Sequence, residues 1–320
     1  MKIRRLLKVI VFFILGGIFL TAGGAFSYEQ ISRVIAERTY TPEGELVDVG
    51  DHKLHVYRRG NSSPTVIFES GMDPFGHLSW FKVQEEIARS ATTISYDRAG
   101  ILWSERGVRP KSSESITDDL AKLLAIGDYP KPYIVVGHSL AGITLRKFVE
   151  THKDDIVGIV LVDVSHPDQA NIRPPKMPPR FMMTLMNSFG LLRLMSSRLM
   201  PNTEATDPIN QVAPSLIHKS VAGSFDEAAA VVQLSEEARN INSFGDIPLV
   251  VISATSFTQN ASPSESELVD LRSKMQEDLL LLSTDSKQIL ATQSTHYVQL
   301  EEPSVVIEAI ERLVARAISQ

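Results

Sequence analysis

The chain contains no cysteine among its 320 residues. This absence excludes disulfides, thiolate metal sites and a cysteine nucleophile, but it leaves the redox compartment undetermined, because a disulfide-free protein can function in any of them. A basic block is also missing after the first few residues, and the sequence pI is near 5.8. This charge distribution gives no indication of a nucleic-acid partner.

Long apolar runs are missing too, apart from one near the N-terminus. A basic cluster precedes an apolar run over residues 9–26, and its length of about 18 residues is close to the lower limit for a transmembrane helix. We therefore predict a signal anchor over residues 1–30, a stalk over residues 31–44, and a remaining chain on the extracytoplasmic side of the membrane. A cleavable signal peptide, with Gly23 and Ala25 before the cut and a secreted product, is the alternative.

The chain from Glu45 onward alternates between strand and helix patterns. That order is typical of a mostly parallel sheet with helices on both faces. We predict strands over residues 46–49, 54–57, 65–68, 92–96, 133–136, 157–162, 248–253 and 288–291, and helices over residues 78–90, 115–126, 265–282 and 303–317. Residues 169–245 have no strong strand pattern, and prolines divide this methionine-rich segment into short helices. We therefore predict one domain over residues 45–320, with a helical cap inserted after the sixth strand.

The stretch from Tyr133 to Gly142 carries the strongest chemical signal. Its apolar strand runs into Gly137, His138 and Ser139, after which a helical pattern begins. A strand, a sharp turn and a helix in this order place a serine hydroxyl at the carboxyl edge of a sheet, in front of the amides of a helix N-terminus. We therefore predict that Ser139 is a nucleophile.

The sequence Gly-His-Ser-Leu-Ala over residues 137–141 resembles the G-x-S-x-G nucleophile elbow of the α/β hydrolases, with Ala141 in place of the last glycine. Glu69-Ser70-Gly71-Met72 and Asp97-Arg98-Ala99-Gly100 resemble two further loops of that family, and we interpret Asp97, Arg98 and Ser104 as scaffold. The resemblance covers residues 45–320. It implies the α/β-hydrolase fold, with a mostly parallel eight-stranded sheet, and a reaction without a metal or organic cofactor.

A serine nucleophile needs a base, and the base needs a third group that holds its tautomer. Residues 295–303, between the last strand and the terminal helix, resemble the family's histidine loop, which implies that His296 is the general base and acid. The usual position of the acid, after the seventh strand, has no carboxylate until Glu265. Some members of the family carry the acid after the sixth strand, where Asp163 lies here. We therefore assign Asp163, and Asp168 and Glu265 are the alternatives.

The resemblance also implies an oxyanion hole formed by the backbone N–H groups of Leu140 and Met72. In the cap, we predict that Met182, Met183 and Met186 line a substrate pocket for an apolar acyl or alcohol group, because methionine side chains adapt to varied shapes. A methionine-rich contact between helices is the other interpretation of the same cluster.

The predicted protein is a membrane-anchored, carboxylesterase-like serine hydrolase. Its predicted substrate is a small molecule with a carboxylic ester or related acyl bond and an apolar group. An amidase or aminopeptidase, a lactonase and a perhydrolase would use the same residues, because selectivity depends on the cap. A non-catalytic, membrane-anchored binding module and a membrane-associated partner domain are the alternatives from other classes.

Overall fold

An eight-stranded sheet forms the centre of the molecule, with the strand order β1-β2-β4-β3-β5-β6-β7-β8. The structure is a computed structural model that describes the chain except residues 1, 173–176, 199, 202, 257–262 and 320. The strands are β1 (Glu45–Asp48), β2 (Lys53–Arg59), β3 (Thr65–Glu69), β4 (Thr92–Tyr96), β5 (Tyr133–His138), β6 (Ile156–Val162), β7 (Leu249–Ala254) and β8 (Ser286–Ala291). β2 is antiparallel to both of its neighbours, and the other pairs are parallel. This confirms the predicted mostly parallel sheet.

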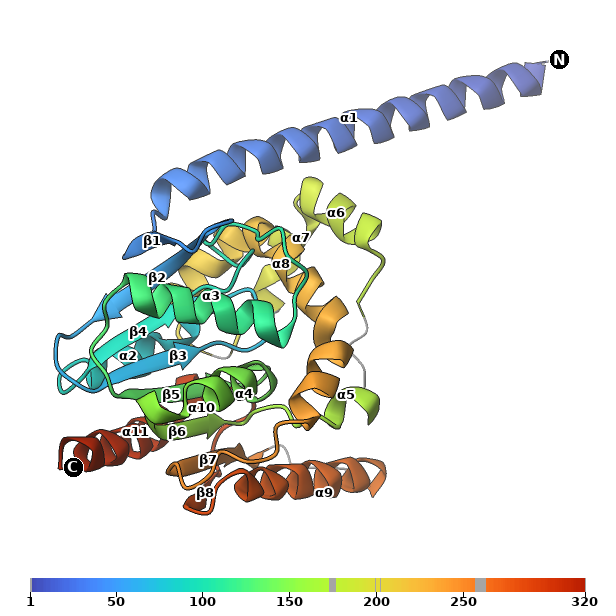
Figure 1. Ribbon diagram of the computed structural model, residues 1–320. Coiled ribbons are helices and arrows are strands. Elements are labelled where there is room, and N and C mark those ends of the chain that lie inside the picture. The colour runs from blue at the N-terminus through green and yellow to red at the C-terminus, as the bar shows by residue number, and fades with distance from the viewer. Residues whose placement is uncertain (1, 173–176, 199, 202, 257–262, 320) are drawn as a thin grey trace.

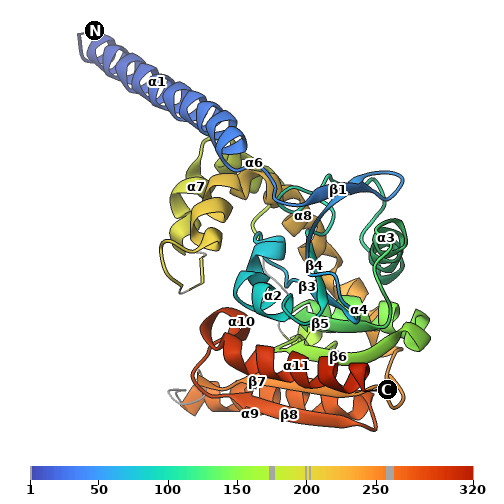
Figure 2. The same cartoon turned by 90° about the vertical axis from the view of Figure 1, so that its left-hand side faces the viewer.

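Helices cover both faces of this sheet (Figures 1 and 2). α3 (Ser113–Ile126) and α4 (Ala141–Thr151) pack on one face, and α2 (Phe81–Ile87) and α11 (Pro303–Ile318) pack on the other. Because side chains alternate along a strand, Val135 of β5 belongs to the first core and its neighbour Val136 belongs to the second. Strands that are buried on both faces are apolar throughout, which is why the sequence pattern located them well.

Two predicted helices contain 3-10 segments at one end. The helix predicted over residues 78–90 begins as η1 (Gly76–Trp80) and continues as α2, and the helix predicted over residues 265–282 consists of α9 (Pro263–Asp278) and η5 (Leu279–Leu282). The structure adds the short elements η2 (Lys153–Asp155) and α10 (Val298–Glu301), which the sequence patterns did not indicate.

A helical insertion connects β6 to β7, where the cap was predicted. It contains α5 (Gln169–Ile172), α6 (Arg180–Ser188), α7 (Leu191–Met195), η3 (Ser196–Arg198) and α8 (Pro208–Arg239), and every regular element in its described part is helical. The long helix α8 contacts α4 and α5, and it also contacts α1, α6 and α7. The insertion therefore links the edge of the sheet to the N-terminal part of the chain.

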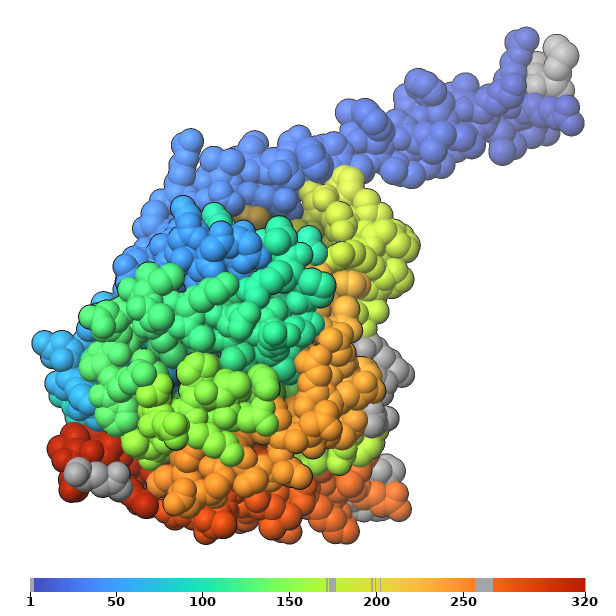
Figure 3. All heavy atoms as spheres, in the orientation of Figure 1, coloured from blue at the N-terminus to red at the C-terminus, as the bar shows by residue number. Residues whose placement is uncertain are grey.

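The N-terminal helix α1 (Lys2–Thr39) is continuous over 38 residues. Within the described residues it is the one helix that is long and apolar enough to cross a membrane, and its apolar window is not buried. A signal sequence has the same properties. Most of the predicted stalk belongs to this helix, and its C-terminal turns lie against the cap rather than standing free (Figure 3).

Candidate active site

Ser139 lies in the turn between β5 and α4, at the carboxyl end of the strand. Its φ of +54° is in the left-handed region that residues other than glycine rarely adopt. The Ser139 carbonyl accepts hydrogen bonds from the N–H groups of Gly142 (3.1 Å) and Ser165 (2.8 Å), which hold the turn in place. The turn therefore presents a half-buried hydroxyl at the rim of the sheet.

Gly137 explains why an alanine at position 141 is accommodated. A Cβ atom added to Gly137 would lie 2.7 Å from the Cβ of Ala141 and 2.7 Å from Cδ1 of Leu145. β5 and α4 can approach this closely because Gly137 has no side chain. The single methyl group of Ala141 fits against that bare backbone, so the departure from the family pattern is small in volume.

His296 lies in the loop between β8 and α10 and faces Ser139. Its Nε2 is 2.8 Å from Oγ of Ser139, and its Nδ1 is 2.6 Å from Oδ2 of Asp163. The imidazole is 39% exposed, whereas the Asp163 side chain is fully enclosed. The three side chains thus form one chain of hydrogen bonds from the interior to the rim of the sheet.

Asp163 directly follows β6 and is an anchored carboxylate. Its Oδ1 accepts a hydrogen bond from the Ala254 N–H (3.1 Å), and its Oδ2 accepts from His296 and from Nη2 of Arg272 on α9. Burial by itself would raise the pKa of Asp163, but the hydrogen bond from His296 and the charge of Arg272 hold that pKa below its usual value. An ionised Asp163 only accepts hydrogen bonds, so His296 carries its proton on Nδ1 and its Nε2 accepts from the Ser139 hydroxyl.

The two alternative acids do not share this arrangement. The Asp168 side chain is 54% exposed and accepts a hydrogen bond from Arg239 at 2.6 Å. The side chain of Glu265 lies outside the described part of the structure. The structure therefore brings Ser139, His296 and Asp163 together and leaves Asp168 at the surface.

The turn over residues 70–72 lies beside the serine. A Cβ atom added to Gly71 would be only 2.9 Å from the Cβ of Ser139. Arg98 donates hydrogen bonds to the carbonyls of Ser70 (2.6 Å) and Gly71 (2.7 Å). A trans peptide directs its C=O and N–H to opposite sides, so the Gly71 carbonyl that faces Arg98 directs the Met72 N–H away from Arg98.

Arg98 is held in turn by the cap. Its Nε and Nη2 donate to the two carboxylate oxygens of Glu227 on α8, at 2.8 and 2.9 Å, and both side chains are buried. Burial would lower the pKa of Arg98, but the charge of Glu227 outweighs it and raises that pKa. This bidentate pair restrains both groups geometrically. The interpretation of Arg98 as scaffold fits these contacts, whereas Glu227 carried no sequence signal, because a single glutamate on a helix is ordinary.

His138 supports the loop that carries His296. Its Nε2 donates to the His296 carbonyl at 2.8 Å, and the two ring centroids are 4.6 Å apart. Burial, followed by the charge of His296, lowers the pKa of His138 to about 3, so this histidine is neutral at physiological pH. The sequence indicated no role for His138 beyond the turn itself.

The family follows from the sequence match as well as from this geometry. Residues 64–243, more than half of the chain, match the family model of the alpha/beta hydrolase fold. The chain belongs to the α/β-hydrolase family. Two solved structures have the same fold. A thermophilic esterase from Thermogutta terrifontis with malate bound is 18% identical, with a TM-score of 0.59 over 87% of this chain and 96% of that one. The epoxide hydrolase CorEH is 16% identical, with a TM-score of 0.63 over 86% and 99% of the two chains.

Curated relatives of this α/β hydrolase are more varied. The protein named "Uncharacterized protein YqjL" of Bacillus subtilis (strain 168) is 26% identical over 278 residues, which are 86% of this chain and 90% of that protein. "Probable transporter efuK" of Hormonema carpetanum is 32% identical over 154 residues, and the match spans 45% of this chain and only 21% of that protein. The first match therefore covers most of both chains, whereas the second covers about a fifth of the other protein.

A cavity of about 120 Å³ lies against Ser139 in this α/β hydrolase. Its walls include Leu140 and Ile143 of the elbow region, Ala170 of α5 and Val231 of α8. This volume is well below the roughly 300–1,000 Å³ of typical ligand pockets, so it fits a small group. Most of the wall is apolar, and Ser165, His166 and Gln169 add polar atoms to it. Cavities of about 370 and 420 Å³ lie elsewhere, and neither is lined by Ser139 or His296. We assign the site to the smaller cavity because the Ser139 side chain lines it.

The cap methionines lie in a different place. Met182, Met183 and Met186 belong to α6, which contacts α1, α7 and α8, and they are not among the residues that line the cavity at Ser139. The structure therefore does not bring these predicted pocket residues to the nucleophile. Met72 is the methionine that lines this cavity.

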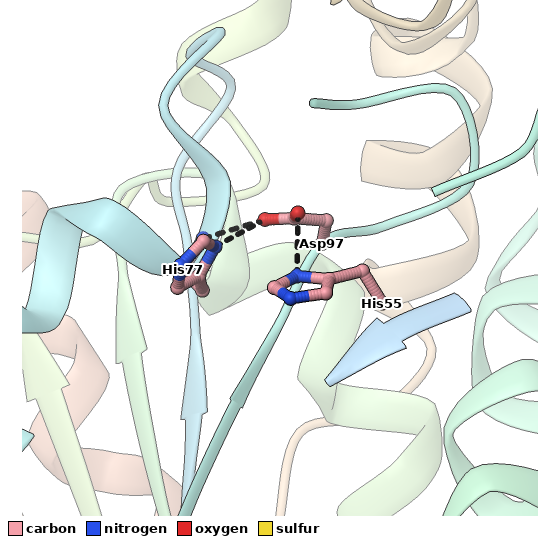
Figure 4. A group of neighbouring side chains, drawn as sticks. All are labelled: His55, His77 and Asp97. Atoms are coloured by element: carbon pink, nitrogen blue, oxygen red, sulfur yellow. Dashed lines mark hydrogen bonds and ion pairs between the residues drawn. The ribbon is translucent and has the colours of Figure 1, made fainter. Parts of the chain in front are cut away.

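A second histidine–aspartate group lies inside the domain, where His55, His77 and Asp97 are close enough to hold a metal ion (Figure 4). Nδ1 of His55 and Nδ1 of His77 are each 2.9 Å from an oxygen of Asp97, and Nε2 of His55 is 2.6 Å from the Glu43 carbonyl. Each of these ligand atoms already has a hydrogen-bond partner. The arrangement fits a buried polar brace better than an ion site.

A third group, Asp51, His52 and Asp119, also has metal-ligand spacing. Arg109 forms ion pairs with both aspartates, at 3.7 Å to Asp51 and 2.5 Å to Asp119. Its guanidinium already supplies the positive charge that these carboxylates attract, which disfavours a metal ion there.

Proposed function

We propose that this α/β hydrolase is a serine hydrolase that cleaves a carboxylic ester or a related acyl bond through an acyl-serine intermediate. The observation that carries the proposal is the hydrogen-bonded chain in which His296 lies 2.8 Å from Ser139 and 2.6 Å from Asp163. Each member has the hydrogen-bonding role that such a reaction requires of it.

In the proposed reaction, Ser139 Oγ attacks the substrate carbonyl while its proton passes to Nε2 of His296. The same proton then goes to the leaving alcohol, and the acyl group stays on Ser139. A water molecule then attacks this ester while one of its protons passes to Nε2 of His296. His296 returns that proton to Ser139 Oγ as the bond between Oγ and the acyl carbon breaks and the acid product leaves. Asp163 keeps the imidazole in the correct tautomer and stabilises the imidazolium that forms in both steps.

The oxyanion is proposed to bind the backbone N–H groups of Leu140 and Met72. Leu140 follows the nucleophile at the start of α4, where the amides of a helix N-terminus favour negative charge. Met72 is directed by the contact between Arg98 and the Gly71 carbonyl. Donors fixed in this way lower the barrier because they need no reorganisation during the reaction.

The small apolar cavity supports an acyl group or alcohol of modest size as the part that enters it. A serine at the elbow disfavours chemistry like that of dehalogenases and epoxide hydrolases, in which an aspartate at this position forms an ester with the substrate. The structural neighbours include both an esterase and an epoxide hydrolase, so the choice between these chemistries rests on Ser139 itself.

The proposal places the protein at a membrane. α1 serves as an uncleaved signal anchor, and the domain lies on the extracytoplasmic side, because basic residues precede the apolar run. The support for retention is that α1 continues as a helix past the run and packs on the cap. Comparing the sizes of membrane-bound and soluble forms tests this: a soluble product shorter by about 25 residues would mean signal-peptide cleavage instead.

A fluorophosphonate probe tests the nucleophile directly. The parent chain and Ser165→Ala should be labelled, and Ser139→Ala should not be labelled. Ser165 is a matched control because it lines the same cavity. Labelling that survives in Ser139→Ala would dismiss Ser139, and a parent chain with neither labelling nor turnover would favour a binding module. Rates on matched esters and anilides would then separate esterase from amidase activity.

A further inference from the structure

α6 and α7 carry an exposed apolar surface. Its six large side chains are between 39% and 78% exposed, and we call them the cap patch: Phe181, Met182, Leu185, Leu191, Leu194 and Met195. Scattered apolar residues are normal on a protein surface, but several on two short successive helices mark a contact surface. The identity of the contact partner follows from where these helices lie.

The cap patch begins where the apolar run of α1 ends. Phe26, the last residue of that run, has its ring 6.1 Å from the ring of Phe189, which joins α6 to α7. All three views show this part of the cap beside α1 (Figures 1, 2 and 3). The exposed apolar surface of α1 and the cap patch are therefore neighbours in space.

A buried charged group fixes the cap to α1. Glu29 is only 1% exposed and accepts hydrogen bonds from Arg193 of α7 (2.8 and 3.2 Å) and from Arg33 (2.9 Å). Arg33 also donates to the Asn187 carbonyl of α6 at 2.5 Å. The guanidinium groups of Arg193 and Arg33 therefore form ion pairs with the buried Glu29 carboxylate from two elements of the chain. Breaking such a pair would leave a buried charge uncompensated, so α7 keeps its position relative to α1.

We infer that the cap patch lies in the interface of the same bilayer that α1 crosses. The run over residues 9–26 spans about 27 Å as a helix, close to the roughly 30 Å of a hydrocarbon core. Glu29 lies three residues after Phe26, about 4.5 Å further along the helix. Its bonds to Arg193 therefore hold α7 at the membrane boundary, where an interfacial helix buries its apolar side chains roughly 5–10 Å deep.

The bilayer is favoured over a second copy of the chain because the cap patch adjoins a surface that must already be in lipid. This inference rests on the proposed anchor and is independent of the chemistry at Ser139. It also narrows the proposed substrate class, because α5 and α8 of the same cap line the cavity at Ser139. The acyl compounds that reach this cavity most readily are amphiphilic esters dissolved in the membrane.

The absence of native cysteines permits a clean labelling test. Leu194→Cys in the cap patch and Leu281→Cys on η5 are matched positions, since the leucines are 78% and 76% exposed. Each full-length variant carries an environment-sensitive fluorophore in phosphatidylcholine nanodiscs, with and without doxyl-labelled lipid. We expect doxyl lipid to quench the label at position 194 and not the label at position 281. Equal quenching at both positions, or a blue shift at 194 without doxyl quenching, would overturn the inference, and the second result would indicate a protein partner.

A kinetic experiment tests the substrate class. Leu191→Asp with Leu194→Asp should reduce hydrolysis of a long-chain ester embedded in vesicles, while hydrolysis of a water-soluble short ester and fluorophosphonate labelling stay at parent levels. Leu281→Asp is the control. Equal losses on both esters would contradict the membrane route. If the parent chain hydrolyses neither ester while the quenching result holds, the proposed function fails and the bilayer contact stands.

Discussion

The Ser139–His296–Asp163 group and the His55–Asp97 pair both join a histidine to a fully buried aspartate, and they differ in what the second ring nitrogen of the histidine faces. His296 contacts Asp163 through Nδ1 and the Ser139 hydroxyl through Nε2, and its side chain is 39% exposed. His55 contacts Asp97 through Nδ1 and the Glu43 carbonyl through Nε2, and it is fully buried. The same pair of residue types therefore meets a nucleophile in one place and a backbone acceptor in the other.

The difference matters because the backbone acceptor fixes the charge on His55. A carboxylate and a carbonyl both accept hydrogen bonds, so His55 donates from both nitrogens and is an imidazolium. Burial would lower the pKa of His55, but the charge of Asp97 and the two hydrogen bonds raise it. His55 thus joins the segment after α1 to the end of β4, and its role is structural.

The largest expected effect is on the catalytic rate, through the Ser139–His296–Asp163 group. Asp163→Asn should lower kcat by about 10⁴-fold, because the amide favours the wrong tautomer of His296. The measurement is turnover of a soluble ester, with thermal unfolding to confirm the fold. Asp168→Asn is the control and should keep parent activity, since Asp168 pairs with Arg239 at the surface. Full turnover in Asp163→Asn would show that Asp163, like Asp97, has no part in catalysis.

Substitutions in the buried His55–Asp97 pair should change the stability of the fold rather than the catalytic rate. Asp97→Asn removes the charge that balances His55 inside the domain, so we expect a loss of about 3–5 kcal/mol in the free energy of unfolding. Denaturant titration of the full-length chain in detergent measures it. Asp285→Asn, which breaks a surface pair with Arg316, should change stability by less than about 1 kcal/mol. Similar values for both variants would argue against a buried charged brace.

The free energy of unfolding should decrease both at high pH and at low pH. The folded pKa of His55 is raised, so its contribution is complete below about pH 6.5 and is lost as pH rises through the folded value. The pKa of Asp97 is lowered, because the charges of His77 and His55 outweigh its burial. Its contribution is present above about pH 3.9 and is lost as pH falls.

Unfolding free energies measured between about pH 2 and pH 10 test both sides of this expectation. Each titration contributes a slope of at most about 1.4 kcal/mol per pH unit. His55→Gln should flatten the alkaline side of the profile. An unchanged alkaline decline in that variant would assign the decline to another group.

The smallest effect is expected at Arg272, a positioning residue that contacts Asp163. Arg272→Gln should raise the pKa of Asp163, while the bonds from His296 and Ala254 remain. We expect less than a tenfold loss of kcat/KM at neutral pH, equivalent to about 1.4 kcal/mol, and a larger loss below pH 6. Lys274→Gln on the same helix is the control. A loss that is equal at all pH values would indicate a purely structural role.

Much of the framework could be predicted from the sequence, because its signals are local. Strands that are apolar on both faces, such as β5, stand out against polar loops, and the turn at Ser139 combines a strand, small residues and a helix within ten positions. The position of His296 between the last strand and a proline-initiated helix was equally local. The 3-10 segments η1 and η5 were missed because their side-chain pattern resembles that of an ordinary helix.

The cap shows why other features could not be predicted. The methionines of α6 were assigned to the pocket from composition alone, but which face of a short helix meets the substrate depends on how α6 packs against α1 and α8. The roles of Glu227 and Arg272 likewise could be recognised only from their contacts in the structure, with Arg98 and Asp163 respectively. The sequence around a single charged residue on a helix does not indicate which residue it contacts.

By itself, the sequence determined the order of strands and helices, the apolar N-terminal helix and the serine turn, because backbone preference and side-chain period act over a few residues. The resemblance assigned Asp163 and left Asp168 as an alternative, but only the tertiary structure showed that Asp163 contacts His296, since these two partners lie 133 residues apart along the chain. It also decided that Asp97 is enclosed by two histidines and that the cap lies against α1. These outcomes depend on how segments that are distant in the sequence pack together, and local backbone preferences carry no information about such contacts.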